Sequence, residues 1–190
     1  MATGLKTLFE TELTDTVNYS ATDDRQGDKD GVGRLRWDED GNVYRWVQNW
    51  HTVALAEGNI VTHTYSDAAN ALERVRDNLT ADLGFMAGVV MATASVTKDT
   101  DGSTGDGGYC WVQCHGYNAT AAVRPDTNST PAAGETMIGL TAQLALNAPG
   151  VAMGSAPLHI RNCMVVEAVS QNASATAGTI AATKVWVNCL

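Results

Sequence analysis

Two six-residue segments of the chain share one alternation of apolar and polar positions. They are Tyr44-Arg45-Trp46-Val47-Gln48-Asn49 and Tyr109-Cys110-Trp111-Val112-Gln113-Cys114. Successive side chains of a β-strand point to opposite faces of the sheet, so each segment is predicted to form a half-buried strand. In the first copy, Tyr44, Trp46 and Gln48 are expected on one face. Each copy follows a turn signal rich in Asp and Gly, which favours a hairpin framework.

Short apolar runs in the rest of the chain predict further strands. The predicted strands cover residues 33–37, 42–49, 59–64, 88–97, 109–117, 120–124, 137–146, 160–169 and 183–189. Gly, Asn and Pro separate them, which is typical of a sandwich or barrel and not of alternating strands and helices. The predicted fold class is therefore mainly β, an antiparallel sandwich or barrel with one short helix and an extended N-terminal arm.

The predicted helix lies between the third and fourth of these strands. Ser66 or Asp67 is a suitable N-cap. The apolar residues that follow fall at helical spacing; they are Leu72, Val75, Leu79 and Leu83. Gly84 is expected to end the helix.

Composition limits the classes of partner. With 190 residues the chain has the length of about one domain, and it carries a net charge of −9. This acidity argues against nucleic acid or an anionic membrane as a partner. No run of roughly 20 apolar residues is present, so no membrane-spanning helix is expected. The N-terminal residues lack a signal-peptide apolar stretch, and we expect synthesis in a cytoplasm.

Charged residues are unevenly distributed along the chain. Residues 1–30 are predicted to form an arm, and residues 31–190 a single β-rich domain. The arm combines an acidic stretch with a small apolar patch, Leu5, Leu8, Phe9 and Leu13, suited to a groove on a partner chain. Residues 132–190 contain only four charges. Such a surface is typical of one packed against another chain, and a compact core with Thr and Ser outside explains it equally well.

Four cysteines are candidates for special chemistry: Cys110, Cys114, Cys163 and Cys189. Cys110 and Cys114 would lie about 13 Å apart in a strand, too far to share one zinc ion. Disulfides to Cys163 or Cys189, on neighbouring strands, are one hypothesis for an oxidising environment. Buried thiols are the favoured interpretation for any single cysteine.

Catalytic and metal motifs are not found in the sequence. The histidines His51, His63, His115 and His159 belong to no His-Glu-x-x-His motif, and no Gly-x-Ser-x-Gly motif occurs. The acidic loops 38–41 and 99–106 lack the spacing of a calcium loop and are predicted to be solvated turns. We therefore expect no catalytic residues, no metal and no cofactor. A small hydrolase with a spatial pair of carboxylates stays a distant alternative.

The chain resembles the head decoration (cement) proteins of tailed bacteriophages. The resemblance covers residues 33–125 and rests on the first Tyr-x-Trp-Val copy, residues 44–49, and on three segments that follow it. They are Ala54-Leu55-Ala56-Glu57-Gly58-Asn59-Ile60-Val61, Ala87-Gly88-Val89-Val90, and Gly108-Tyr109-Cys110-Trp111-Val112-Gln113-Cys114-His115-Gly116. The cysteines at positions 110 and 114 and the long acidic arm depart from the family pattern.

This resemblance implies a structural virion protein without enzymatic activity. Such a protein binds the outside of a capsid, contacts the major capsid protein, reinforces its lattice and associates as a homotrimer. Trp46, Trp111, Gly108 and Trp186 are then expected to be structural anchors, since tryptophan supplies a large apolar surface and glycine frees the backbone before a strand. The alternative is a β-rich fibre or spike module that binds a host receptor or glycan through exposed aromatic residues.

Overall fold

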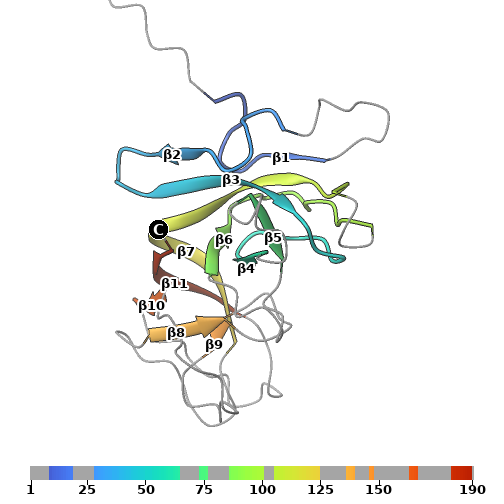
Figure 1. The fold of residues 1–190 in the computed structure, drawn as a ribbon. Coiled ribbons are helices and arrows are strands. Elements are labelled where there is room, and N and C mark those ends of the chain that lie inside the picture. Colours follow the sequence, from blue (N-terminus) through green and yellow to red (C-terminus); the bar gives the residue numbers. More distant parts are fainter. Residues whose placement is uncertain are drawn as a thin grey trace, which may run out of the picture.

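The computed structural model describes residues 9–18, 28–64, 73–76, 86–100, 105–124, 136–139, 146–147, 163–166 and 181–189. This part of the chain contains eleven strands and no helix (Figure 1). The strands are β1 (Thr16–Val17), β2 (Leu35–Trp37), β3 (Val43–Asn49), β4 (Ile60–His63), β5 (Arg74–Arg76), β6 (Met86–Val90), β7 (Tyr109–Arg124), β8 (Thr136–Gly139), β9 (Leu146–Asn147), β10 (Cys163–Val165) and β11 (Ala181–Asn188). The mainly β prediction is confirmed.

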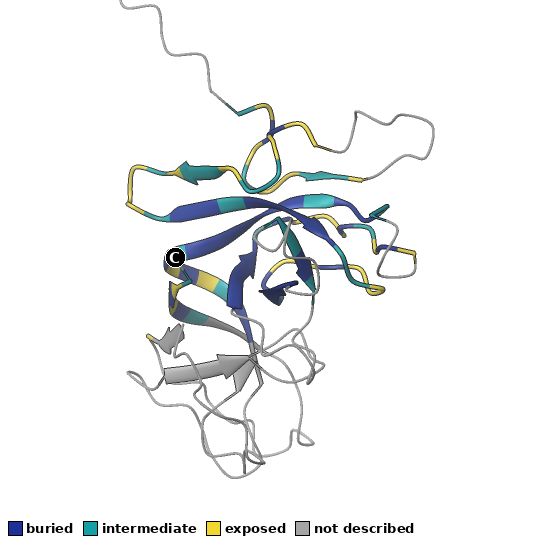
Figure 2. Cartoon of the chain, in the orientation of Figure 1, coloured by how far each residue is buried: buried dark blue, intermediate teal, exposed yellow. Residues whose placement is uncertain are grey.

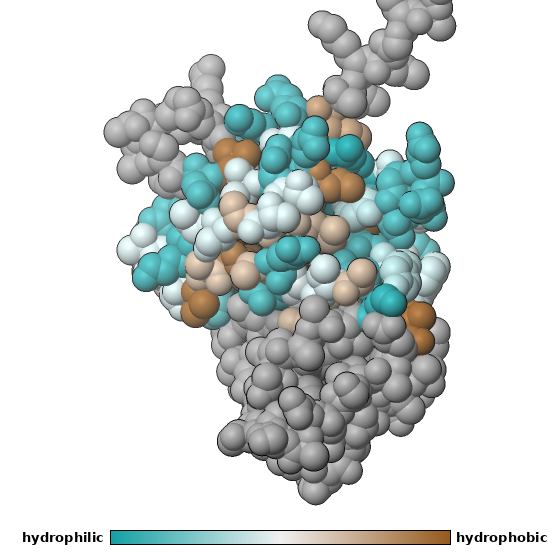
Figure 3. Space-filling view, turned by 180° about the vertical axis from the view of Figure 1, so that it is seen from behind, coloured by the Kyte–Doolittle hydropathy of each residue, from teal (hydrophilic) through white to brown (hydrophobic). Residues whose placement is uncertain are grey.

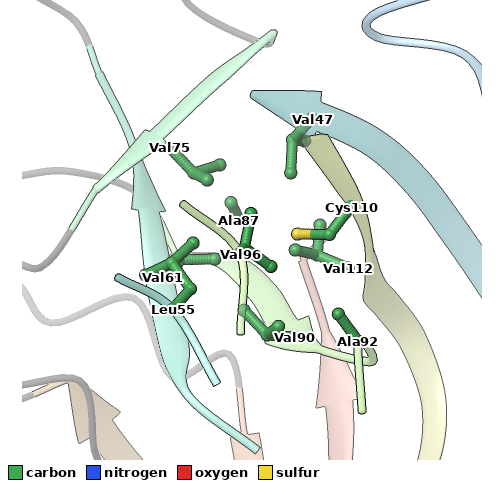
Figure 4. Packing of buried hydrophobic residues seen from close by; sticks show 10 residues of the cluster. All are labelled: Val47, Leu55, Val61, Val75, Ala87, Val90, Ala92, Val96, Cys110 and Val112. Atoms are coloured by element: carbon green, nitrogen blue, oxygen red, sulfur yellow. The ribbon is translucent and has the colours of Figure 1, made fainter. Parts of the chain in front are cut away.

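Five strands close into a barrel, here called the first barrel. The pairings run β3–β5–β4–β6–β7 and return to β3; β3 and β5 are parallel, and the other pairs are antiparallel. One apolar cluster fills the interior (Figure 4). Its members are Val47, Leu55, Val61, Val75, Ala87, Val90, Ala92, Val96, Cys110 and Val112. These residues form the apolar core of the first barrel, and the buried His63 of β4 lies opposite one of them, Val75.

A second ring of strands uses the same order. The pairings run β7–β9–β8–β10–β11 and return to β7. In chain order, the first strand (β7) and the third (β9) are parallel, as β3 and β5 are in the first barrel. Strand β7 is the last strand of the first barrel and the first strand of the second ring. It is long enough to serve both, with 16 residues. The predicted strands 109–117 and 120–124 are therefore one strand, and the predicted strand 137–146 is two, β8 and β9.

A buried cluster joins strand β11 to the first barrel. Val185 and Val187 of β11 are fully buried and cluster with Ile60, Met86 and Val89 of β4 and β6. Figure 2 shows buried residues along β3, β4, β6 and β7. Strand β11 is therefore held both by backbone hydrogen bonds to β7 and by apolar packing.

The helix prediction is wrong at Arg74–Arg76, which form strand β5. Val75 is fully buried. It pairs with His63 of β4 on one side and with Asn49 of β3 on the other. A barrel needs a strand at this place to close, and the tertiary pairing overrides the helical spacing of the neighbouring leucines. Residues 65–72 and 77–85 lie outside the described residues.

Candidate interaction surface

Two tryptophans from the repeated motif meet on the outside of the first barrel. Trp46 of β3 is directly opposite Trp111 of β7, and both side chains are fully buried. Tyr109 stacks on Trp46 with ring centroids 6.3 Å apart. Val47, next to Trp46, points instead into the barrel core. The predicted alternation of faces is confirmed for these residues.

The N-terminal segment covers this aromatic pair. The Phe9 ring meets Trp111 edge-on at 5.4 Å, and Leu13 and Val17 pack against the same cluster. The Trp111 Nε1–H group donates a hydrogen bond of 2.9 Å to Thr11 Oγ1. Phe9 and Leu13, predicted to contact a capsid, therefore contact their own chain. Leu5 and Leu8 lie outside the described residues.

Asp30 fastens this segment to the barrel. Its buried carboxylate accepts hydrogen bonds from the backbone N–H of Glu10 (2.6 Å) and of Thr11 (3.1 Å), and also from the Thr11 hydroxyl. Arg34 and Arg36 place their guanidinium groups 5.0 and 5.3 Å from the centre of the Phe9 ring. The described part of the predicted arm is thus an integral layer of the fold.

A second aromatic pair lies on the second ring and is open to solvent. Trp186 of β11 is directly opposite Tyr117 of β7, and each side chain is 42% exposed. The His115 ring meets Trp186 edge-on at 5.5 Å. Val166, also exposed, donates its backbone N–H to the carbonyl of Lys184 on β11 (2.9 Å). Tyr117, Val166 and Trp186 are here called the aromatic face.

The covered and open aromatic pairs have equivalent places in the fold. Trp46 and Trp111 lie on the first and last strands of the first barrel, and Tyr117 and Trp186 on the first and last strands of the second ring. The sequence around Trp186 repeats part of the motif, because Trp186-Val187-Asn188-Cys189 differs from Trp111-Val112-Gln113-Cys114 only in having Asn in place of Gln. This recurrence is the signal by which the equivalence could have been found from sequence.

Buried side-chain amides bond to the backbone of β7 around Gly116, next to Tyr117. Gly116 has a φ of 103°, a conformation that L side chains rarely adopt. The Gln113 amide donates to the Tyr117 carbonyl (2.9 Å), and the Asn118 amide donates to Gln113 Oε1 (2.8 Å). The backbone N–H of Tyr117 donates to Asn42 Oδ1 (3.1 Å). These hydrogen bonds hold the backbone at Tyr117, which is one residue of the aromatic face.

The remaining predicted anchors and cysteines lie elsewhere. Gly108 donates its N–H to the Thr97 carbonyl (3.0 Å), and a side chain at this position would overlap Thr97 and Asn18. Cys110 lies in the core of the first barrel, where burial raises the pKa of its thiol to about 12. Cys114 is next to Cys189, whose backbone N–H donates to the Cys114 carbonyl (2.7 Å). The side chain of Cys163 is outside the description.

In the first acidic loop, residues 38–41, a carboxylate accepts hydrogen bonds from the residues of the turn and of the strand that follows it. Asp38 accepts hydrogen bonds from the backbone N–H of Asn42 (2.9 Å) and from the Tyr44 hydroxyl (2.8 Å). Burial raises the pKa of Asp38, but these hydrogen bonds outweigh it and leave the pKa below its ordinary value. Within the described ranges, no group of three His, Cys, Asp or Glu side chains is placed to hold a metal ion.

None of the described residues belongs to a helix long and apolar enough to cross a membrane. Seen from behind, hydrophobic residues on the described part occur as separate small spots among hydrophilic ones (Figure 3).

Comparisons of the chain with protein-family models, curated proteins and solved structures found no match.

Proposed function

We propose that the chain is a structural virion protein that binds the outside of a bacteriophage head and stabilises the lattice of the major capsid protein. The proposal rests on the resemblance of residues 33–125 to head decoration proteins. The observation that supports a binding role for the described structure is the open aromatic face. Its equivalent in the first barrel is covered by Phe9, Leu13 and Val17 of the same chain.

A second copy of the chain is the proposed occupant of the aromatic face. Tyrosine and tryptophan are enriched at protein interfaces because they bury a large apolar area and lose little conformational entropy. Two of the three residues of the face, Val166 and Trp186, belong to the segment 132–190, which contains only four charges. A low charge density reduces the cost of removing water when two copies meet. Three copies are proposed on the resemblance alone, since capsid lattices offer three-fold positions.

Contact with the major capsid protein is proposed for the apolar side chains Leu5 and Leu8. Phe9 and Leu13 are already used to cover Trp111. Leu5 and Leu8 continue the same apolar pattern along the sequence, and an apolar segment of this kind can dock in a groove of a partner. In this arrangement, self-association and capsid binding use different parts of the chain.

The oligomer is tested by one substitution on the aromatic face and one away from it. Trp186→Lys places a charge in the proposed contact, and Trp37→Lys places the same charge on the exposed tryptophan of β2. Light scattering should give a trimer mass for the wild type and for Trp37→Lys, and a monomer mass for Trp186→Lys. A wild-type monomer that is also present singly on heads would overturn the proposed self-association.

The capsid role is tested on particles. Heads made without the protein should assemble but release their DNA at a lower temperature than decorated heads, and adding the purified protein should restore the higher temperature. Equal temperatures with and without bound protein would overturn the reinforcement. Failure of the protein to bind heads would overturn the virion assignment.

A host-binding fibre or spike module is the second candidate. The exposure of Tyr117 and Trp186 favours it, because sugar rings stack on aromatic side chains. This candidate predicts that the isolated protein binds host cells or their surface glycans and that Trp186→Ala abolishes this binding. The decoration role instead predicts binding to undecorated heads and none to cells.

A further inference from the structure

Cys114 of β7 and Cys189, the residue that follows β11, are opposite each other in the sheet. The antiparallel register pairs His115 with Asn188 and Gly116 with Val187, so Cys114 is opposite Cys189. The backbone N–H of Cys189 donates to the Cys114 carbonyl at 2.7 Å. Residues opposite each other in such a hydrogen-bonded pair have Cα atoms about 5.5 Å apart and side chains on the same face. This separation is within the range of about 4.4–6.8 Å that disulfides adopt.

The surroundings of the two thiols are consistent with this geometry. Burial raises the pKa of Cys114 to about 11, and the nearby Cys189 adds to the rise. Cys114 Sγ lies 3.3 Å from the Val43 carbonyl oxygen, inside the structure, whereas Cys189 is only partly buried. Cys189 is thus the member of the pair that a dissolved oxidant can approach, and Cys114 is opposite it in the strand register.

We propose that Cys114 and Cys189 form a disulfide that covalently ties β11 to β7 when the protein meets an oxidising medium. Glutathione disulfide serves as the oxidant. The Cys189 thiolate attacks it, forms a mixed disulfide and releases one glutathione thiol. The Cys114 thiolate then attacks the Cys189 sulfur, the Cys114–Cys189 bond forms, and the second glutathione thiol leaves. Two protein thiols are oxidised and one glutathione disulfide is reduced.

Register and burial select this pairing among the four cysteines. Cys110 is enclosed in the core of the first barrel and, four residues from Cys114 along one strand, is about 13 Å away. Cys163 is opposite Val187 in the pairing of β10 with β11. It is therefore a diagonal neighbour of Cys189, with Cα atoms about 7–8 Å apart, beyond disulfide range. The inference does not depend on the capsid role.

The bond would change the stability of the whole chain. It closes a loop that runs from the first barrel through every strand of the second ring, and long loops restrict the unfolded state most. For a chain of this size we expect the midpoint of thermal unfolding, Tm, to rise on the order of 5–10 °C. The aromatic face, which includes Trp186 on β11, would be fixed by the same link.

The test uses the full chain, equilibrated folded in a buffer of oxidised glutathione. Thiol titration in denaturant should fall from four to two, and peptide mapping without reductant should recover one cross-linked peptide that contains Cys114 and Cys189. The Cys189→Ser variant should lose the cross-link and the rise in Tm. The Cys110→Ser and Cys163→Ser variants should keep both. Four remaining thiols, or a linkage through Cys110 or Cys163 in the wild type, would overturn the proposal.

Discussion

Trp46 and Trp111 face each other across strands β3 and β7 with ring centroids 5.2 Å apart and their planes inclined by 55°. The same register sets Tyr44 opposite Gln113 and Gln48 opposite Tyr109. The two copies of the motif therefore pair with each other, and the Tyr of each copy meets the Gln of the other. The two segments that repeat along the sequence are therefore in contact in the structure.

Trp111→Ala should lower the free energy of unfolding by about 3–5 kcal/mol, because it empties a fully buried site and leaves Trp46 and Phe9 without their common neighbour. Denaturant unfolding measures the loss. Trp37→Ala is the matched control: its side chain is 63% exposed on β2, away from the proposed contact, and we expect a change within about 1 kcal/mol. Equal losses in the two variants would show that Trp111 is not a buried anchor.

Asp30→Ala should release the N-terminal segment from the first barrel. The substitution removes the acceptor of three hydrogen bonds and leaves the buried N–H of Thr11 without it, at a cost of about 1–3 kcal/mol. Limited proteolysis should then cut within residues 9–18 sooner than in the wild type. Asp40→Ala, which changes an exposed aspartate in the turn before β3, should leave the cleavage rate unchanged.

The strands that carry the Tyr-x-Trp-Val motif could be predicted because burial on one face imposes a period of two. Val75 shows the limit of this approach. Its spacing to Leu72 and Leu79 also fits a helix, and only the closure of the first barrel selects a strand. Closure is a property of all five strands and leaves no local signal at Arg74–Arg76.

The aromatic face could be predicted only in part. Trp186 stood out as a tryptophan in a terminal strand, but its partner Tyr117 depends on β7 continuing through Gly116 into the second ring. The turn-forming Gly and Asn residues near Gly116 suggest an interruption there, and the buried amides of Gln113 and Asn118 instead keep the strand paired. The pairing of Cys114 with Cys189 follows from this register and could not be chosen beforehand.

Gly88→Ala should destabilise the first barrel by about 3 kcal/mol or more. Gly88 has a φ of 147°, and a Cβ atom there would overlap the backbone carbonyl of Gln113 on β7. Gly41→Ala is the control, since Gly41 also has a positive φ, 81°, but its Cβ would meet open space. It should cost about 1 kcal/mol from backbone strain alone. Similar unfolding midpoints for the two variants would contradict close packing of β6 on β7.

His63 should make the stability depend on pH in acid. Burial in β4, with the charge of Arg45 as a smaller cause, lowers its pKa from 6.5 to about 4. Between these values the unfolded chain binds a proton that the folded chain does not. The contribution of His63 is therefore fully present above pH 6.5 and is lost as the pH falls towards 4, by up to about 1.4 kcal/mol per pH unit.

Urea unfolding at a series of pH values measures this slope of stability against pH. His63→Gln, which cannot titrate, should flatten the slope relative to the wild type, while His115→Gln, at a partly exposed histidine, should preserve it. An unchanged slope in His63→Gln would show that His63 does not stay neutral in the folded barrel.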